Sequence, residues 1–181
     1  MSRFPDLVAH LRTHSLRTDG PFALRSGEAS DWYLDARRTT LDGQGGWLVG
    51  AAVVDVLVPD VDAVGGLTMG ADPVAVATAM VSNSRGQRLR AFSVRKESKG
   101  HGIEGRLVGP VEPGDQVAIV EDTTTTGGAI TEALDVAVAT GLQVVQVVAV
   151  CDRSYGKVAG LLAERSVPFV ALVQPSDLGV T

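Results

Sequence analysis

The chain has 181 residues, of which 45% are hydrophobic and 20% charged, a composition typical of one soluble globular domain. Its formal net charge of −5 argues against a nucleic-acid-binding surface as its main function. The single cysteine, Cys151, excludes an internal disulfide and is typical of a reducing compartment. Without an apolar signal-peptide core or an apolar stretch long enough to span a bilayer, a cytoplasmic protein is expected.

The first segment of the chain is predicted to be an amphipathic helix over residues 4–16, because its apolar residues recur at helical spacing. Gly20-Pro21 ends it. His10 and His14 lie four positions apart on this helix. No third ligand is close in sequence, so we interpret them as a surface pair and not as a metal site.

A hairpin-like hood is predicted next, from two short extended runs at 22–25 and 32–36. It would bring Arg25, Trp32 and Tyr33 close together, and such a cation and aromatic rings suit a flat anionic ligand. The alternative is a small apolar plug with an exposed arginine.

Strands and helices alternate through the rest of the chain. The predicted strands are 61–64, 89–94, 106–109, 117–120, 143–150 and 168–173, and the predicted helices are 44–58, 74–82, 129–140 and 159–165. This alternation predicts an α/β fold: a doubly wound, mostly parallel sheet flanked by helices. We expect residues 1–40 to form the N-terminal helix and hood, residues 41–181 to form the α/β core, and residues 174–181 to be peripheral.

The clearest chemical signal lies in residues 117–129, where a predicted buried strand is followed by Glu121, Asp122, four threonines and two glycines. A turn of this kind before a helix gathers backbone N–H groups and the positive end of the helix dipole, which together bind phosphate. The carboxylates can accept hydrogen bonds from sugar hydroxyls. The turn has no Walker lysine, so nucleoside triphosphate hydrolysis is not indicated. The alternative is an ordinary strand-to-helix turn.

Three other unusual segments also follow predicted strands. Residues 65–73 form a glycine-dense turn, residues 95–102 contain three cations and a histidine, and residues 151–153 place Arg153 just beyond a valine-rich strand. Open α/β sheets bind ligands at the carboxyl ends of their strands, so these segments are expected to meet in one site. Cys151 is interpreted as a small buried apolar residue and not as a nucleophile.

These segments carry a resemblance that extends from about residue 4 to about residue 173. Residues 120–129 resemble the phosphoribosyl-pyrophosphate (PRPP) motif of type I phosphoribosyltransferases. The basic loop at 95–102 is similar to that of the orotate phosphoribosyltransferase family, residues 22–35 resemble its hood, and Asp152-Arg153 resembles the segment whose arginine meets the orotate carboxylate.

The resemblance implies a Mg²⁺-dependent transfer of ribose 5-phosphate from PRPP to orotate, giving orotidine 5′-monophosphate and pyrophosphate in de novo pyrimidine synthesis. It also implies a homodimer in which loop 95–102 serves the neighbouring subunit, with small-molecule substrates and neither nucleic acid nor membrane as partner. Two alternatives remain: a phosphoribosyltransferase with a purine or uracil acceptor, and a PRPP-sensing regulatory protein.

The resemblance also implies roles for individual residues. The expected catalytic residues are Lys99, His101 and Asp122. The expected PRPP-binding residues are Arg95, Lys96, Lys99, His101, Glu121, Asp122, Thr123, Thr124, Thr125, Thr126, Gly127, Gly128 and Ala129. The expected orotate-binding residues are Thr125, Arg153, Arg25 and Tyr33. No metal-ligand pattern is visible, so Mg²⁺ is expected to be held mainly by substrate and water.

The chain departs from the family pattern in two places. Many members carry a lysine in the pyrophosphate loop where Met69 stands here, so backbone N–H groups and the basic loop are expected to hold pyrophosphate. Few residues follow the last predicted strand, so a C-terminal covering element of larger members is not expected.

Overall fold

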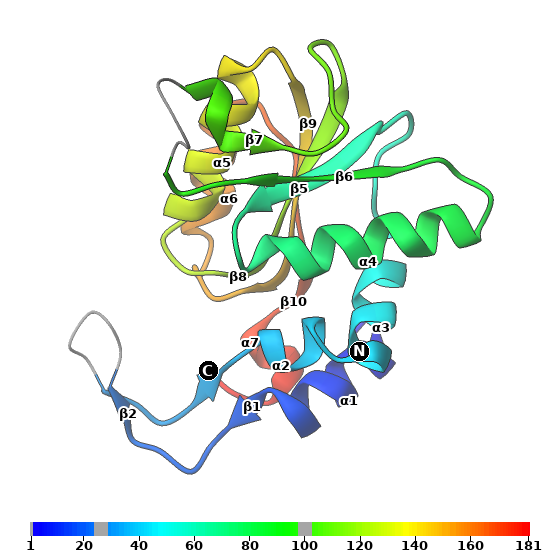
Figure 1. Cartoon of the computed structure of the whole chain (residues 1–181). Coiled ribbons are helices and arrows are strands. Elements are labelled where there is room, and N and C mark those ends of the chain that lie inside the picture. Colours follow the sequence, from blue (N-terminus) through cyan, green and yellow to red (C-terminus); the bar gives the residue numbers. More distant parts are fainter. Residues whose placement is uncertain (1, 24–28, 98–102) are drawn as a thin grey trace.

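The computed structural model describes residues 2–23, 29–97 and 103–181 (Figure 1). In these residues the core is a six-stranded sheet with the order β10-β9-β8-β5-β6-β7, in which only β7 runs antiparallel to its neighbour. The strands are β5 (Ala63–Leu67), β6 (Arg90–Val94), β7 (Leu107–Val108), β8 (Gln116–Thr124), β9 (Gln143–Asp152) and β10 (Phe169–Val173). The predicted doubly wound, mostly parallel sheet is confirmed.

Helices cover both faces of the sheet (Figure 1). They are α1 (Pro5–His14), α2 (Arg37–Thr40), α3 (Gly43–Val54), α4 (Ala71–Ser84), α5 (Gly128–Ala139), α6 (Lys157–Glu164) and α7 (Pro175–Leu178), with a 3-10 helix η1 (Ile103–Arg106). Strand alternation divides β8 between two cores. Ala118 and Val120 pack in the core that contains α3 and α4 residues, whereas Val117 and Ile119 pack in the core that contains α5 and α6 residues.

The hood consists of two short antiparallel pairs, β1 (Leu16–Arg17) with β4 (Tyr33–Leu34) and β2 (Phe22–Ala23) with β3 (Ala29–Ser30). The C-terminal segment packs against it, so the expectation that residues 174–181 are peripheral is wrong. Leu178 is buried in the main core, and the Trp32 indole N–H donates to the Thr181 carbonyl at 3.0 Å. An apolar residue in α7 and an indole donor in the hood thus hold this segment in place.

Three strands extend beyond their predicted carboxyl ends. β8 continues through Glu121 and Asp122 to Thr124, β9 continues to Asp152, and β5 continues through Gly65 and Gly66. A Cβ on Gly65 would lie 2.3 Å from the Phe92 carbonyl oxygen, and one on Gly66 would lie 2.2 Å from that of Val120. These glycines therefore permit close packing inside the sheet, and the turn expected at 65–73 is confined to the residues between β5 and α4.

The interpretation of His10 and His14 as a surface pair is wrong for His10, which is buried. Its Nδ1 hydrogen-bonds with Thr39 Oγ1 at 3.1 Å and its Nε2 with Asp42 Oδ1 at 3.2 Å. Asp42 caps the N-terminus of α3 by accepting from the backbone N–H groups of Gln44 and Gly45. His10 thus connects α1 to the start of α3.

Across the described ranges, none of the helices has the length and apolar character that crossing a bilayer requires.

Candidate active site

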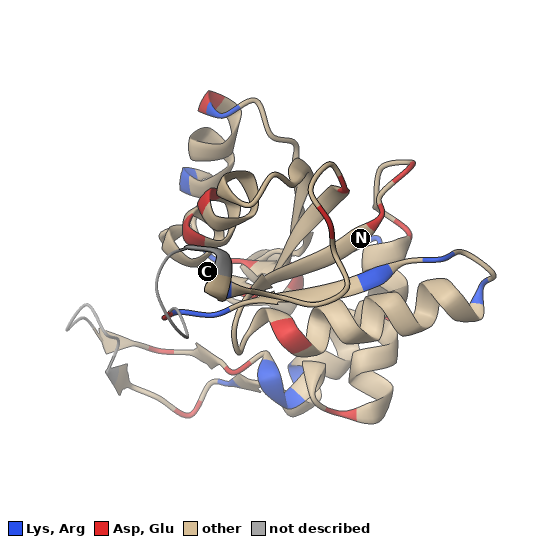
Figure 2. Cartoon of the chain, turned by 45° about the horizontal axis from the view of Figure 1, so that its top comes forward, with Lys and Arg blue, Asp and Glu red and all other residues tan. Residues whose placement is uncertain are grey.

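A pocket of about 410 Å³ lies where the carboxyl ends of β5, β6 and β8 meet the hood. Its lining comes from residues 33–37 of the hood and α2, residues 67–70 at and after the end of β5, Lys96 after β6, residues 121–123 of β8, and Ala129 of α5. Figure 2 shows the basic segment after β6 and the basic α2 toward the same end of the sheet. The pocket therefore brings together three of the unusual segments, at 65–73, 95–102 and 121–129, through the lining residues named above.

The acidic pair faces the turn that follows β5. A Cβ on Gly70 would lie 2.7 Å from Asp122 Oδ1 and 3.1 Å from Glu121 Oε1, so the turn approaches both carboxylates closely and a side chain at this position would crowd them. Asp122 Oδ1 accepts from the Thr123 backbone N–H at 2.7 Å. Glu121 is 7% exposed, and its Oε2 has no hydrogen-bond partner among the described residues.

The pKa of the Glu121 carboxyl group is shifted by its surroundings. Burial raises the pKa of Glu121 to about 9, the neighbouring Asp122 adds to the rise, and the Lys96 cation opposes it. At neutral pH Glu121 is therefore a neutral acid that can donate a hydrogen bond as well as accept one. A pair of this kind is suited to sugar hydroxyls, which also both donate and accept.

The turn after β5 is held by Asp72, a residue that the sequence analysis did not single out. Thr68 Oγ1 and Ser93 Oγ each donate to a different Asp72 carboxylate oxygen at 2.6 Å, and the Thr68 backbone N–H donates to the Val94 carbonyl. The Thr68–Met69 peptide bond is cis. The sequence analysis placed Asp72 in the glycine-dense turn at 65–73, but in the structure it stands in the first turn of α4, where an acid by itself indicates only a favourable helix dipole contact.

The threonine turn divides into buried and exposed residues. Thr124 belongs to β8 and is buried, whereas Thr125, Thr126 and Gly128 are exposed at the start of α5. Gly127 has φ 81°, a left-handed conformation that favours glycine, and its carbonyl accepts the first hydrogen bond of the helix from Thr131. Free backbone N–H groups therefore gather beside exposed hydroxyls, as an anion site requires.

Arg153 follows β9 and lies against the hood. Its guanidinium carbon is 4.3 Å from the centroid of the Trp32 ring, and its Nε has no hydrogen-bond partner among the described residues. Its backbone N–H donates to the Thr124 carbonyl at 2.8 Å, which places it beside the threonine turn. Tyr33 is partly exposed and lines the pocket. Arg25, the other expected hood contact, lies outside the described residues.

The basic segment after β6 is described only in part. Arg95 is half-buried and Lys96 is exposed at the pocket, but Lys99 and His101 lie outside the described residues. Cys151 is fully buried, and burial raises its pKa to about 12, which agrees with its interpretation as an apolar residue. Within the described ranges, no three His, Cys, Asp or Glu side chains come together in a way that could hold a metal ion.

A mostly parallel sheet with an acidic pair and a Thr/Gly turn at its carboxyl edge, covered by a hood, defines a type I phosphoribosyltransferase. The orotate phosphoribosyltransferase of Streptomyces avermitilis is 44% identical over 162 residues, which cover 89% of each chain. No protein-family model matches the chain.

Solved structures of orotate phosphoribosyltransferase are also similar to this chain. Orotate phosphoribosyltransferase of Mycobacterium tuberculosis H37Rv with Fe(III) dicitrate has a TM-score of 0.86 and 35% identity, covering 97% of this chain and 98% of that one. The same enzyme in complex with PRPP has a TM-score of 0.81 and 32% identity over the same shares. The chain belongs to the orotate phosphoribosyltransferase family.

Proposed function

We propose that the chain transfers ribose 5-phosphate from PRPP to orotate with the help of Mg²⁺, in the de novo pathway to pyrimidine nucleotides. The observation that carries this proposal is a single pocket lined by the acidic pair, Lys96 and the hood, with Arg153 beside the threonine turn. Family membership supplies the acceptor, because the relatives are orotate enzymes. A purine or uracil acceptor, or a purely regulatory role, has no comparable support.

The sugar phosphate is assigned to β8 and α5. Residues 123–129 would bind the 5′-phosphate through free backbone N–H groups at the start of α5 and through the exposed hydroxyls of Thr125 and Thr126. Glu121 and Asp122 would bind the ribose 2′- and 3′-hydroxyls. Loss of pyrophosphate leaves positive charge on the ribose ring, so the nearby Asp122 carboxylate would also stabilise that charge as a catalytic residue.

The leaving pyrophosphate is assigned to the segment after β6. Arg95 and Lys96 would bind it, together with Lys99 and His101, which are our candidates for stabilising or protonating the departing group. One cation about 4 Å from a phosphate oxygen contributes roughly 4 kcal/mol at an effective dielectric near 20, before desolvation costs. The role of Lys99 and His101 rests on family resemblance, because both lie outside the described residues.

Orotate is assigned to the space beneath the hood formed within residues 1–40. The Arg153 guanidinium would pair with the orotate carboxylate in a bidentate arrangement, and its unpartnered Nε leaves donors available for that contact. Thr125 would donate to the ring, while Tyr33 and Arg25 would cover it from the hood. Stacking against Trp32 holds the guanidinium near the pocket before the base arrives.

The donor set beside the pocket fits Mg²⁺, which prefers carboxylate oxygens and retains water and substrate ligands. Asp122 lines the pocket and supplies a carboxylate that would contact the metal. Substrate oxygens and water would supply the other ligands. Bound Mg²⁺ would offset the negative charge that develops on pyrophosphate.

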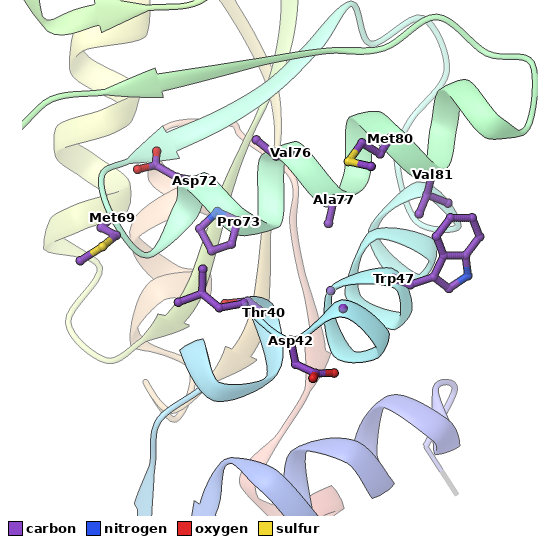
Figure 3. A pocket seen from close by; sticks show the side chains of 13 residues that line it. Thr40, Asp42, Trp47, Met69, Asp72, Pro73, Val76, Ala77, Met80 and Val81 are labelled. Atoms are coloured by element: carbon purple, nitrogen blue, oxygen red, sulfur yellow. The ribbon is translucent and has the colours of Figure 1, made fainter.

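We further propose a homodimer, supported by an apolar groove next to the pocket (Figure 3). The groove has a volume of about 500 Å³ between α3 and α4, and its exposed apolar side chains include Trp47 (54% exposed) and Met80 (66% exposed). Met69 lines both the groove and the active-site pocket, so a second copy bound in the groove would lie beside the active site. Clustered apolar exposure of this kind marks a protein interface. The basic loop is proposed to serve the neighbouring subunit, in a cytoplasmic enzyme.

The decisive experiment follows the ultraviolet absorbance of orotate after addition of PRPP and Mg²⁺. The expected result is a decrease that requires all three components and stops with EDTA. Parallel assays with uracil and hypoxanthine test the alternative acceptors. A flat trace with orotate from folded protein, or turnover of uracil or hypoxanthine instead, would overturn the proposal.

A further inference from the structure

Arg106 lies where the chain re-enters the sheet after the basic segment. The Arg95 backbone N–H donates to the Arg106 carbonyl at 2.8 Å, and Arg106 Nε donates to the Arg95 carbonyl at 2.7 Å. These two hydrogen bonds extend the pairing between β6 and β7, in which Val94 faces Leu107. The backbone of Arg95 is therefore held on both its N–H and its carbonyl side by one residue.

The same side chain reaches helix α5. Arg106 Nη2 donates to Glu132 Oε1 and forms an ion pair with that carboxylate. The Arg106 side chain is 18% exposed and that of Glu132 is 40% exposed. A guanidinium has five N–H donors in a rigid fork, so one arginine can bind a carbonyl and a carboxylate at once, which lysine cannot reproduce.

Glu132 stands one turn after the start of α5. A hollow of about 460 Å³ beside the ion pair is lined by Arg106 and Glu132 and also by Thr126, Gly128 and Thr131. Two of these, Thr126 and Gly128, belong to the turn assigned to the 5′-phosphate. Arg106 thus connects the segment assigned to pyrophosphate with the helix whose first turn is assigned to the 5′-phosphate.

We propose that Arg106 and Glu132 form a positioning pair that sets Arg95 and Lys96 relative to the N-terminus of α5. This inference rests on the proposed function, because PRPP carries a phosphate at one end and a pyrophosphate at the other. Both ends bind well only if the two groups of donors stand at the correct separation. The pair does not touch the substrate; it acts through the backbone of Arg95 and so through the position of Lys96 at the pocket.

The test compares steady-state kinetics of the unsubstituted chain with Arg106→Gln, Glu132→Gln and the double variant. Arg106→Gln is expected to raise the KM for PRPP about tenfold, and Glu132→Gln about threefold, while the KM for orotate stays nearly constant. The double variant is expected to match Arg106→Gln alone, because both substitutions remove one shared connection. Arg106→Lys should rescue only part of the loss, since it cannot make both contacts.

Asp135→Asn is the matched control. Asp135 lies on the same helix and pairs with Arg165 at 2.5 Å, but it has no hydrogen bond to the segment after β6 among the described residues. Its loss should leave both KM values unchanged. Melting temperatures of all variants separate positioning from a general loss of stability, and Glu132→Gln provides the test if Arg106→Gln does not fold.

An unchanged KM for PRPP in Glu132→Gln and Arg106→Gln would overturn the inference, as would equal effects of Glu132→Gln and Asp135→Asn. Effects on both substrates that follow the melting temperature would also overturn it. Orotate turnover by the unsubstituted chain distinguishes a failure of the proposed function from a failure of this inference. Its absence overturns the proposed function and this inference together, whereas normal turnover with unaffected variants overturns the inference alone.

Discussion

The guanidinium carbon of Arg153 lies 4.3 Å from the centroid of the Trp32 ring, so a residue at the end of β9 is stacked against the hood. Trp32 is itself fixed, because it is buried and its indole N–H donates to the Thr181 carbonyl. The C-terminal segment therefore helps to hold the aromatic ring on which the proposed orotate-binding arginine rests. A guanidinium held over an indole ring is fixed in position, while its N–H donors, which lie in its own plane, stay available to a carboxylate.

Replacing Trp32 should therefore weaken orotate binding selectively. Trp32→Leu removes the ring and is expected to raise the KM for orotate about tenfold, whereas Trp32→Phe keeps a ring and should raise it about threefold. The KM for PRPP serves as the internal control, because the residues assigned to PRPP lie on other segments. Equal increases in both KM values, measured by initial rates, would contradict a selective role for the stack.

Much of the fold could be predicted because hydrophobic periodicity is a local property. The fully buried residues Val117 to Val120 of β8 alternate between two helix-covered faces, and the continuous apolar runs of β8 and β9 indicated strands buried on both faces. The ends of strands could not be predicted in the same way. Gly65 and Gly66 are typical turn residues, but both pair with β6, and the nearby carbonyls of Phe92 and Val120 leave no room for a side chain at either position.

The candidate site was predictable in composition but not in contacts. Residue types at strand ends indicated which segments would meet, since parallel strands share a ligand-binding edge. The partners of His10, Asp72 and Arg153 could not be predicted, because each contact joins segments that are distant in sequence. The raised pKa of Glu121 likewise depends on burial, which a sequence of two adjacent acids does not reveal.

Glu121 should make stability depend on pH in a defined direction. Its pKa in the folded chain is about 9, above its ordinary value of 4.5, so between these values the folded chain holds a proton that the unfolded chain has released. The free energy of unfolding should therefore fall as pH rises through this window. Glu121→Gln removes the effect and is expected to be more stable than the unsubstituted chain by about 2 kcal/mol at pH near 8.5.

Urea unfolding at pH 5 and pH 8.5, without substrates, measures this effect. Near pH 5 the gain from Glu121→Gln should be small, because this pH lies only just above the ordinary pKa of 4.5, where the loss of stability with rising pH has barely begun. Asp122→Asn is the companion variant: it removes a neighbouring charge that raises the pKa of Glu121, so it should weaken the pH dependence. An identical gain in the free energy of unfolding from Glu121→Gln at both pH values would show that the Glu121 carboxyl is not the source of the pH dependence.

Two glycine substitutions should change stability in opposite directions. In Gly66→Ala the new Cβ would lie 2.2 Å from the Val120 carbonyl oxygen and 2.7 Å from the Ala71 Cβ, so the free energy of unfolding should fall by about 3 kcal/mol. Gly160 lies inside α6 with open space around it, so Gly160→Ala should raise the free energy of unfolding by roughly 0.5 to 1 kcal/mol. Urea titration of both variants checks the pair, and a loss in Gly160→Ala would contradict the packing described for α6.

A charge placed in the apolar groove should weaken self-association. Met80→Asp would bury a carboxylate between subunits and is expected to raise the dimer dissociation constant at least about thirtyfold. Val138→Asp is the matched control, because Val138 is 55% exposed on α5, whose buried residues pack in the other core. Sedimentation velocity over a range of concentrations measures both. An unchanged dissociation constant in Met80→Asp would place any interface elsewhere.

Sharing of the basic loop between subunits should be visible as complementation. Lys99→Ala is expected to disable the proposed function of the loop, and Arg153→Ala is expected to disable the proposed base site of the same chain. If the loop of one subunit serves its neighbour, a mixed dimer has one active site with both defects and one with neither. Mixing two nearly inactive homodimers should then restore up to about one quarter of the unsubstituted activity per subunit, since half of the dimers are mixed at random exchange.

Subunit exchange must be verified independently, for example by mass spectrometry of tagged chains. If loop and base site belong to the same subunit, every site in the mixture carries a defect, and activity should stay at the level of the separate variants even after complete exchange.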